Sequence, residues 1–152
     1  MEGWFIANTH QKYLIEAIQL AQKNKSEGGR PFGAVVVREG KILSIGVNGM
    51  ARNHDVSSHA ELEAIRSATQ KQKNVNLEDC TIYASGHPCP MCLAAILMTN
   101  IKTVYYAFDN SDAEPYGLSS EQTYLKLGIV KDKVPLLLMK LDVGIAAKDV
   151  YL

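Results

Sequence analysis

The 152-residue chain has no net charge, little cysteine and no long apolar segment. Sixteen basic residues balance sixteen acidic ones, whereas domains that grip a polynucleotide usually carry a basic surplus. Uninterrupted apolar runs such as 93–98 are far too short to span a bilayer. Neither a membrane nor a nucleic acid is therefore the expected partner, and the charge balance favours a small-molecule substrate.

Cysteine is limited to three residues, two of which form the pair Cys89 and Cys92. This number does not suggest a disulfide framework, and thiolate ligands suit a reducing compartment. Residues 1–5 show no basic segment followed by a long apolar stretch, so no secretory signal is evident. We therefore expect a cytoplasmic protein.

Hydrophobic residues make up 47% of the chain, which is enough for one compact domain over residues 1–152. Apolar periodicity and turn residues predict helices at 9–25, 59–71, 90–100 and 121–127, with a final helical turn after 144. Strands are predicted at 33–38, 41–48, 80–85, 102–108 and 134–141, with polar loops at 48–58 and 109–120. This order predicts an α/β fold in which helices flank one mixed sheet.

Two short motifs carry the chemistry, His59-Ala60-Glu61 and, further along the chain, Pro88-Cys89-Pro90-Met91-Cys92. His59, Cys89 and Cys92 supply three ligands, the number that a catalytic zinc site uses when water takes the fourth position. Glu61 follows the histidine closely enough to exchange protons with that water. The pattern His-x-Glu followed by Pro-Cys-x-x-Cys is typical of zinc-dependent nucleobase deaminases.

Each part of this pattern also has a simpler interpretation. Ser58-His59-Ala60-Glu61 matches a capping box, in which Glu61 would only hydrogen-bond to the backbone at a helix start. A single histidine at a helix start is more often structural, and Cys89 and Cys92 alone could be a redox pair. The combination favours zinc, because both motifs start predicted helices, and adjacent strands would bring those helix starts together.

The remaining cysteine and histidines have no comparable spacing partners. Cys80 lies in a strand pattern and is expected to be a small buried residue. His54 and His87 flank the two motifs and could line the mouth of the site, but solvated loop histidines are the simpler interpretation.

On these residues the chain resembles the cytidine deaminase-like superfamily over about residues 28–124, and within it the bacterial guanine deaminases. The matching residues are Pro31-Phe32-Gly33-Ala34, Asn48, His59-Ala60-Glu61, Ile65-Arg66, the stretch 88–93 and Asp112-Ala113-Glu114. The resemblance implies a three-layer α/β/α sandwich with a five-stranded mixed sheet and one zinc ion per chain. It also implies a homodimer whose subunits complete each other's pockets and exchange their carboxyl-terminal segments.

Residue by residue, the resemblance implies that His59, Cys89 and Cys92 hold the zinc and that Glu61 shuttles protons. The substrate-binding residues that it implies are Phe32 for packing on the ring, Asn48 for the purine edge and the backbone of Ala60 beside the reacting carbon. The implied activity is hydrolytic deamination of a free nucleobase or a related aminated heterocycle. Guanine, which would give xanthine and ammonia, is the first candidate.

Three departures from the guanine deaminase pattern concern the surroundings of the zinc motifs. Ser120 aligns with a second acidic residue of those enzymes, while Glu114 and Glu121 lie nearby but displaced. His87 stands where a glutamate usually precedes the Pro-Cys pair. The tail after Val134 is shorter and lacks the aromatic-rich end that closes the guanine pocket.

Two other functions stay open at this point. Transfer RNA-specific adenosine deaminases share these motifs, although the neutral charge, the Cys-Pro-Met-Cys form and the loop Asp112-Ala113-Glu114 favour a free base. A non-catalytic zinc-binding partner subunit is the second alternative. Such proteins often lose the carboxylate, whereas Glu61 is present here.

Overall fold

A computed structural model describes the backbone of residues 2–152 and the side chains of residues 8–152. The side chains of residues 1–5, on which the expected absence of a secretory signal rests, lie outside this description. Five strands form one mixed sheet in the order β2-β1-β3-β4-β5. Their bounds are β1 (Gly33–Arg38), β2 (Lys41–Val47), β3 (Cys80–Gly86), β4 (Thr103–Phe108) and β5 (Leu137–Lys140). β1 is antiparallel to both β2 and β3, whereas β3, β4 and β5 run parallel.

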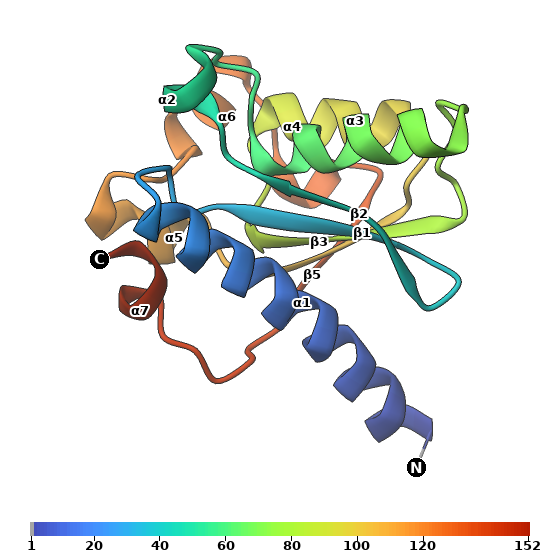
Figure 1. Cartoon of the computed structure of the whole chain (residues 1–152). Helices are drawn as coiled ribbons and strands as arrows, with labels where there is room; N and C mark the ends of the chain where they lie inside the picture. The colour runs from blue at the N-terminus through green and yellow to red at the C-terminus, as the bar shows by residue number, and fades with distance from the viewer. Residues whose placement is uncertain (1) are drawn as a thin grey trace.

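Helices cover both faces of this sheet (Figure 1). The long helix α1 (Glu2–Ser26) lies on one face, and α3 (Ala60–Gln72) and α4 (Pro90–Met98) lie together on the other. The shorter elements are α2 (Met50–Asn53), α5 (Asn110–Ala113), α6 (Glu121–Leu127), α7 (Lys148–Tyr151) and two 3₁₀ turns, Glu114–Tyr116 and Lys131–Lys133. The prediction of an α/β/α sandwich with a five-stranded mixed sheet is confirmed.

Strand β1 lies inside the sheet and consists almost entirely of apolar residues. Successive side chains of a strand point to opposite faces, so a strand covered on both sides must be apolar throughout. Ala34 and Val36 pack in the cluster under α3 and α4, whereas Val35 and Val37 pack in the cluster under α1. All four are buried.

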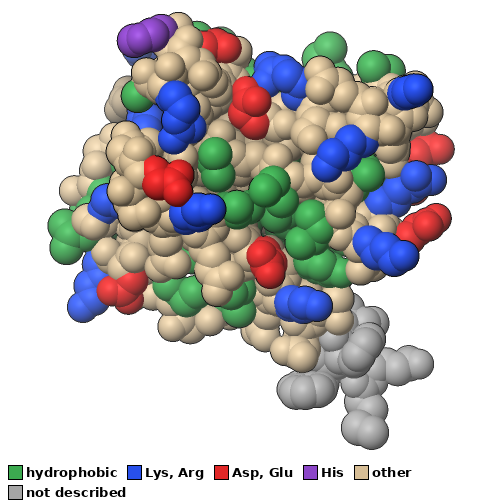
Figure 2. Space-filling model, viewed as in Figure 1, with side chains coloured by type: hydrophobic (Ala, Val, Ile, Leu, Met, Phe, Trp, Pro, Cys, Tyr) green, Lys and Arg blue, Asp and Glu red, His purple; other side chains and the backbone are tan. Residues whose placement is uncertain are grey.

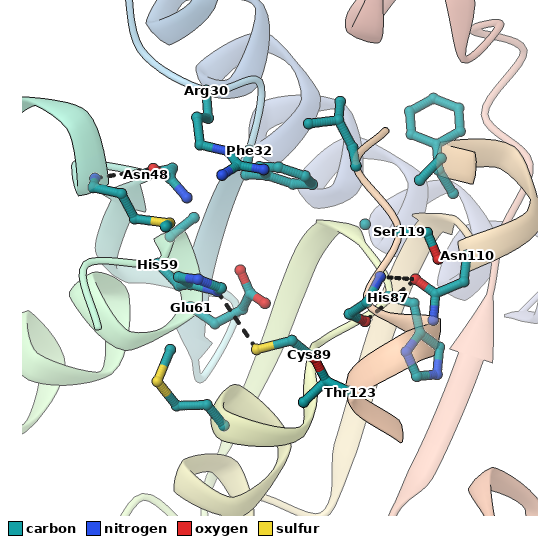
Figure 3. Close-up of a pocket in the computed structure, with 18 of the residues that line it drawn as sticks. Arg30, Phe32, Asn48, His59, Glu61, His87, Cys89, Asn110, Ser119 and Thr123 are labelled. Atoms are coloured by element: carbon teal, nitrogen blue, oxygen red, sulfur yellow. Dashed lines mark hydrogen bonds between the residues drawn. The ribbon is translucent and has the colours of Figure 1, made fainter. Parts of the chain in front are cut away.

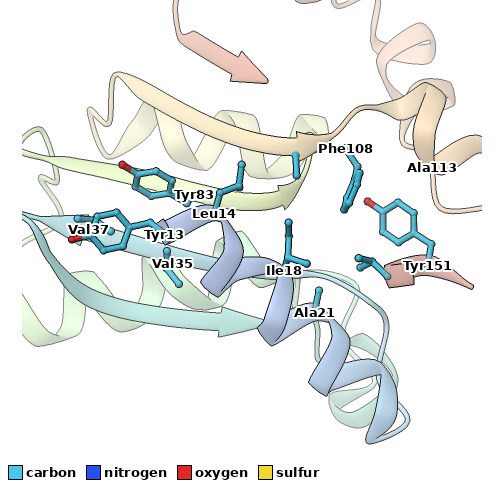
Figure 4. Packing of buried hydrophobic residues seen from close by; sticks show 12 residues of the cluster. Tyr13, Leu14, Ile18, Ala21, Val35, Val37, Tyr83, Phe108, Ala113 and Tyr151 are labelled. Carbon is cyan, nitrogen blue, oxygen red and sulfur yellow. The ribbon is translucent and has the colours of Figure 1, made fainter. Parts of the chain in front are cut away.

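Figure 4 shows the cluster on the α1 side of the sheet. Leu14, Ile18 and Ala21, which share one face of α1, are fully buried in it. At its far end Tyr151 of α7 joins the same cluster beside Phe108 of β4. The carboxyl-terminal turn therefore belongs to the core of the described chain.

The contact between β2 and α3 fixes the start of the helix that carries the first motif. A Cβ on Gly46 would lie 2.2 Å from the Ala60 carbonyl oxygen and 2.5 Å from the Ala64 nitrogen, so only glycine permits this approach. Ser44 Oγ donates a hydrogen bond to the Ala64 carbonyl at 2.6 Å. The first turn of α3 is therefore held against the sheet by backbone contacts.

Two segments predicted as loops contain helices. The segment 48–58 includes α2, and the segment 109–120 includes α5 and a 3₁₀ turn. Asp109 accepts a hydrogen bond from the Asp112 N–H at 2.9 Å, and the Asp112 carboxylate accepts one from the Asp109 N–H at 2.9 Å. This reciprocal capping box starts α5 in a stretch whose polar composition indicated only a loop.

The surface matches the balanced composition. Basic and acidic side chains are interspersed on the face viewed in Figure 2. Within the described part of the chain, no helix is both long enough and apolar enough to cross a membrane.

Candidate metal centre and active-site pocket

His59, Cys89 and Cys92 converge at the starts of two helices. His59 is the N-cap residue of α3, Cys89 is the N-cap residue of α4, and Cys92 lies in the first turn of α4. His59 Nδ1 lies 3.5 Å from Cys89 Sγ and 3.6 Å from Cys92 Sγ, and the three donor atoms lie within 4.8 Å of one another. Tetrahedral zinc with ordinary bond lengths separates nitrogen and sulfur ligands by about 3.6 Å. The donor set and its spacing therefore fit a zinc ion with three protein ligands.

The strands before these two helices are not neighbours, contrary to the prediction. β2 leads toward α3, β3 leads into α4, and β1 lies between the two strands. The helix starts still meet, because α3 lies across both β1 and β2 and contacts α4 (Figure 1). Helix packing, rather than strand adjacency, brings the ligands together.

The local charges favour the metal-binding form of Cys89. A hydrogen bond from Cys92 and the neighbouring His59 hold the pKa of Cys89 well below its usual range. The interaction with Cys89 in turn raises the pKa of His59. The partial positive charge of the α4 amino terminus acts in the same direction on Cys89. Cys89 is therefore a thiolate, the form that binds metals.

The capping-box interpretation of the first motif is wrong. Helix α3 begins at Ala60 with His59 as its N-cap, and no side-chain hydrogen bond caps it. Ser58, which a capping box would place at the N-cap, instead lies with its Oγ 3.2 Å from Glu63 Oε1. The carboxylate of Glu61 is left for another role.

Glu61 is buried next to the three donors, with 7% of its surface exposed. Burial, and next the negative charge of Cys89, raise the pKa of Glu61 to about 7. A carboxyl group with a pKa near neutrality can both accept and release a proton at physiological pH.

A cavity of about 360 Å³ opens from Glu61 between the two helix starts and the end of the chain (Figure 3). This volume is at the small end of the range for ligand pockets. Of the residues predicted to form the site, those in the cavity wall are Phe32, Asn48, His59, Ala60, Glu61 and Cys89. Cys92 is fully buried behind this wall.

Asn48 presents a hydrogen-bond donor to the cavity. Its Oδ1 accepts a hydrogen bond from the Met50 N–H at 3.0 Å, and its NH₂ group points into the cavity (Figure 3). The backbone of Asn48 is fixed on both sides, because its N–H donates to the Phe32 carbonyl at 3.2 Å and its carbonyl accepts from Asn24 Nδ2 at 2.8 Å. Only 3% of the residue is exposed.

Sequence reasoning missed Arg30, Asn110 and Tyr151, which also line the cavity. The ring centroid of Tyr151 lies 5.3 Å from that of Phe108 and 5.9 Å from that of Phe32. Its hydroxyl is buried and has no hydrogen-bond partner among the described residues. The tail has no aromatic-rich end, but its one aromatic residue in the cavity wall, Tyr151, still brings a ring to the cavity.

Helix α7, which carries Tyr151, contacts α1 of the same chain. A single chain can thus bring its own terminus to its own cavity. Exchange of this segment between subunits stays a prediction.

Of the two histidines that flank the motifs, His54 is a solvated loop residue and His87 lines the site. His54 is exposed, as expected for a loop histidine. His87 is half-buried and lines the cavity, and its Nδ1 lies 2.9 Å from the Pro88 carbonyl oxygen. Burial lowers the pKa of His87. The solvated-loop interpretation is therefore wrong for His87.

The other unassigned residues have structural surroundings. His10 is hydrogen-bonded to the Tyr83 hydroxyl at 2.6 Å, and its ring stacks on Tyr105 at 4.2 Å on the α1 side of the sheet. Cys80 is 5% exposed, which confirms the prediction of a small buried residue.

No second free carboxylate lies beside Glu61 in the cavity wall as described for residues 8–152. Ser120 lines the cavity and donates from its N–H to Asn110 Oδ1 at 3.0 Å. The one other acidic residue of the wall is Asp109, whose carboxylate pairs with Lys140 at 2.8 Å.

The two displaced glutamates lie outside the cavity wall. Glu114 is exposed, and Glu121 forms an ion pair with Lys131. Both lie at a shallow hollow on the outer side of the 109–122 segment.

Comparison with known proteins gives consistent similarities. The family model of the cytidine and deoxycytidylate deaminase zinc-binding region matches residues 7–108 of this sequence. Guanine deaminase of Bacillus subtilis (strain 168) is 39% identical over 119 residues, which cover 78% of this chain and 76% of that protein. A tRNA-specific adenosine deaminase of Buchnera aphidicola is 34% identical over 106 residues, covering 69% and 65% of the two chains. The X-ray structure of the Bacillus subtilis guanine deaminase superimposes with a TM-score of 0.76 at 34% identity, over 89% of this chain and 87% of that one.

Proposed function

Because this chain belongs to the cytidine and deoxycytidylate deaminase family and is a zinc-dependent hydrolytic deaminase, we propose that it acts on a free aminated nucleobase. Guanine, converted to xanthine and ammonia, is the first candidate. The observation that carries this proposal is the small cavity in which Glu61 lies next to the three metal donors. The similarity to a bacterial guanine deaminase over most of both chains supports the choice of base.

His59, Cys89 and Cys92 would hold the zinc ion, and Glu61 would move the protons. When bound, zinc lowers the pKa of a water molecule to about 7 and so supplies hydroxide at neutral pH. Glu61 accepts a proton from the attacking water and passes it to the ring nitrogen next to the amine-bearing carbon. It would then take the second proton of the added water and deliver it to the amine, so that one water is consumed and one ammonia is released as the carbonyl forms.

Three wall residues would orient the ring. Phe32 packs on the face of the base, the NH₂ group of Asn48 donates to its edge, and the backbone of Ala60 lies beside the reacting carbon. The cavity encloses a planar ring between these groups and Glu61, which excludes bulk water from the reacting atoms.

Asn48→Ala is expected to raise the KM for guanine by about 10- to 100-fold, because a polar substrate edge loses its partner inside the cavity. Zinc content should stay unchanged, since Asn48 is not among the donors. Steady-state kinetics and metal analysis of the purified variant measure both effects. Asn53→Ala in α2, outside the cavity wall, is the matched control and should keep the wild-type KM. An unchanged KM in the Asn48 variant would remove this residue from the binding site.

The choice of substrate is tested by ammonia release from a panel assayed side by side. The panel contains guanine, adenine, cytosine, aminated triazines and pterins, and a tRNA with an anticodon adenosine. We expect turnover of a free base, with guanine the best substrate. Deamination of the tRNA with every free base untouched would instead assign the chain to the tRNA-specific branch, to which several relatives belong.

The same proposal includes a single deaminase domain over residues 1–152, acting as a homodimer in the cytoplasm. Apolar side chains exposed on α6 and β5 support a partner surface, because covering them with a second chain would remove apolar area from water. The most exposed of them are Leu125, Leu127 and Leu137. Sedimentation of the purified protein tests the dimer, and fractionation of the source cells tests the compartment.

A further inference from the structure

Arg30 brings a positive charge into the cavity that the proposed chemistry leaves unused. The residue is half-buried and lines the cavity. Figure 3 shows its guanidinium beside Phe32, on the same wall as Asn48 and across the cavity from Glu61 and Cys89. Within residues 8–152, no hydrogen bond or ion pair of this guanidinium is formed. Its donors are therefore free to bind a ligand.

The backbone around Arg30 is built to hold this position. Asn24, which is 3% exposed, donates from one Nδ2 to the Arg30 carbonyl at 2.7 Å and to the Asn48 carbonyl at 2.8 Å. The Gly29 N–H donates to the Asn24 carbonyl at 2.8 Å. A Cβ on Gly29 would lie 2.5–2.8 Å from the Asn24 side-chain amide, so the tight loop needs glycine here. One buried amide thus ties Arg30 and Asn48 to each other.

The chemistry of this wall selects what it can bind. A guanidinium offers donors only and is always charged. Asn48 also faces the cavity with its NH₂ group, since its oxygen accepts from the Met50 N–H. Two neighbouring donor groups are satisfied by an oxygen acceptor such as a ring oxo group, and they oppose an amino group, which is itself a donor.

We propose that Arg30 is a specificity-determining residue that, together with Asn48, binds an oxo group of the heterocycle and rejects an amino group at the same place. This inference rests on the proposed action on a free aminated base. It narrows the substrate class to aminated heterocycles that also carry an oxo group, and it disfavours diamino analogues.

Guanine and 2,6-diaminopurine form the matched pair for the test, because they differ only at carbon 6, which bears an oxo or an amino group, and in the hydrogen that guanine carries on the adjacent N1. Equilibrium binding of both is measured on zinc-loaded protein carrying Glu61→Gln, so that turnover does not interfere. Adding Arg30→Ala is expected to weaken guanine binding by about 10- to 100-fold and to change 2,6-diaminopurine binding by less than about threefold. Arg30→Lys should recover part of the preference, because it keeps the charge but not the planar fork.

Arg38→Ala is the control, since Arg38 forms an exposed ion pair with Asp79 far from the cavity wall. It should leave both affinities unchanged. An equal loss for the two purines, or no loss, on Arg30→Ala overturns the inference. If wild-type protein deaminates no free base but the guanine preference collapses as expected, the proposed function fails and the role of Arg30 stands. If guanine is deaminated and the preference survives the change, the function stands and the role of Arg30 fails.

Discussion

Glu61→Gln is expected to lower turnover of the best substrate by about 10²–10⁴-fold with zinc still bound. The amide keeps the size of the side chain but cannot carry a proton between water, ring nitrogen and leaving amine, and general acid–base catalysis contributes an effect of about this size. Burial raises the pKa of Glu61 to about 7, so its carboxyl group can both accept and release a proton near neutral pH. Ammonia release measures the turnover, and metal analysis of the same preparation measures the zinc content.

Glu63→Gln is the matched control for this change. Glu63 lies on the same helix, but its carboxylate pairs with Arg66 and contacts Ser58, outside the cavity wall. The control should retain turnover within about twofold, as exposed substitutions usually do. Near-normal activity of the Glu61 variant, beside a well-behaved control, would rule out Glu61 as the proton carrier.

Cys92→Ser is expected to reduce bound zinc from about one ion per chain to a small fraction and to abolish measurable activity. Cys92 is fully buried and its Sγ lies 3.6 Å from His59 Nδ1, so no solvent-exposed group can take its place. Loss of the metal should also lower the melting temperature, because binding energy at a preformed site adds to folding stability. Metal analysis, activity and thermal unfolding are measured together.

Cys80→Ser provides the comparison, since Cys80 is buried in β3 and is not among the metal donors. That variant should retain zinc and activity even if it unfolds somewhat more easily. A Cys89–Cys92 disulfide without metal, found in wild-type protein under reducing and zinc-replete conditions, would contradict the metal centre and revive the redox-pair hypothesis.

Much of the fold follows from local patterns. Strand β1 was predicted with its observed bounds, because a short apolar run that is rich in β-branched valines and bounded by turn residues favours a buried strand. Helix α6 was also predicted with its observed bounds. The short helices α2 and α5 were not, because their sequences are polar and their caps depend on side-chain hydrogen bonds or on contacts with other segments.

The sequence by itself determined the candidate metal donors and the carboxylate beside them. A zinc ion accepts few side-chain types, and two ligands within one helical turn must lie close together. His59, Cys89, Cys92 and Glu61 were therefore identifiable before any contact was known, and the structure brings them together.

Tertiary structure alone decided which other residues surround these groups. Arg30, Asn110 and Tyr151 are common residue types without diagnostic spacing, and each reaches the cavity only through packing between distant segments. The same holds for the meeting of the two motif helices, which depends on α3 lying across β1 rather than on neighbouring strands. Short sequence motifs identify the metal-binding side chains. The shape and charge of the cavity depend on contacts between distant segments, which short motifs do not predict.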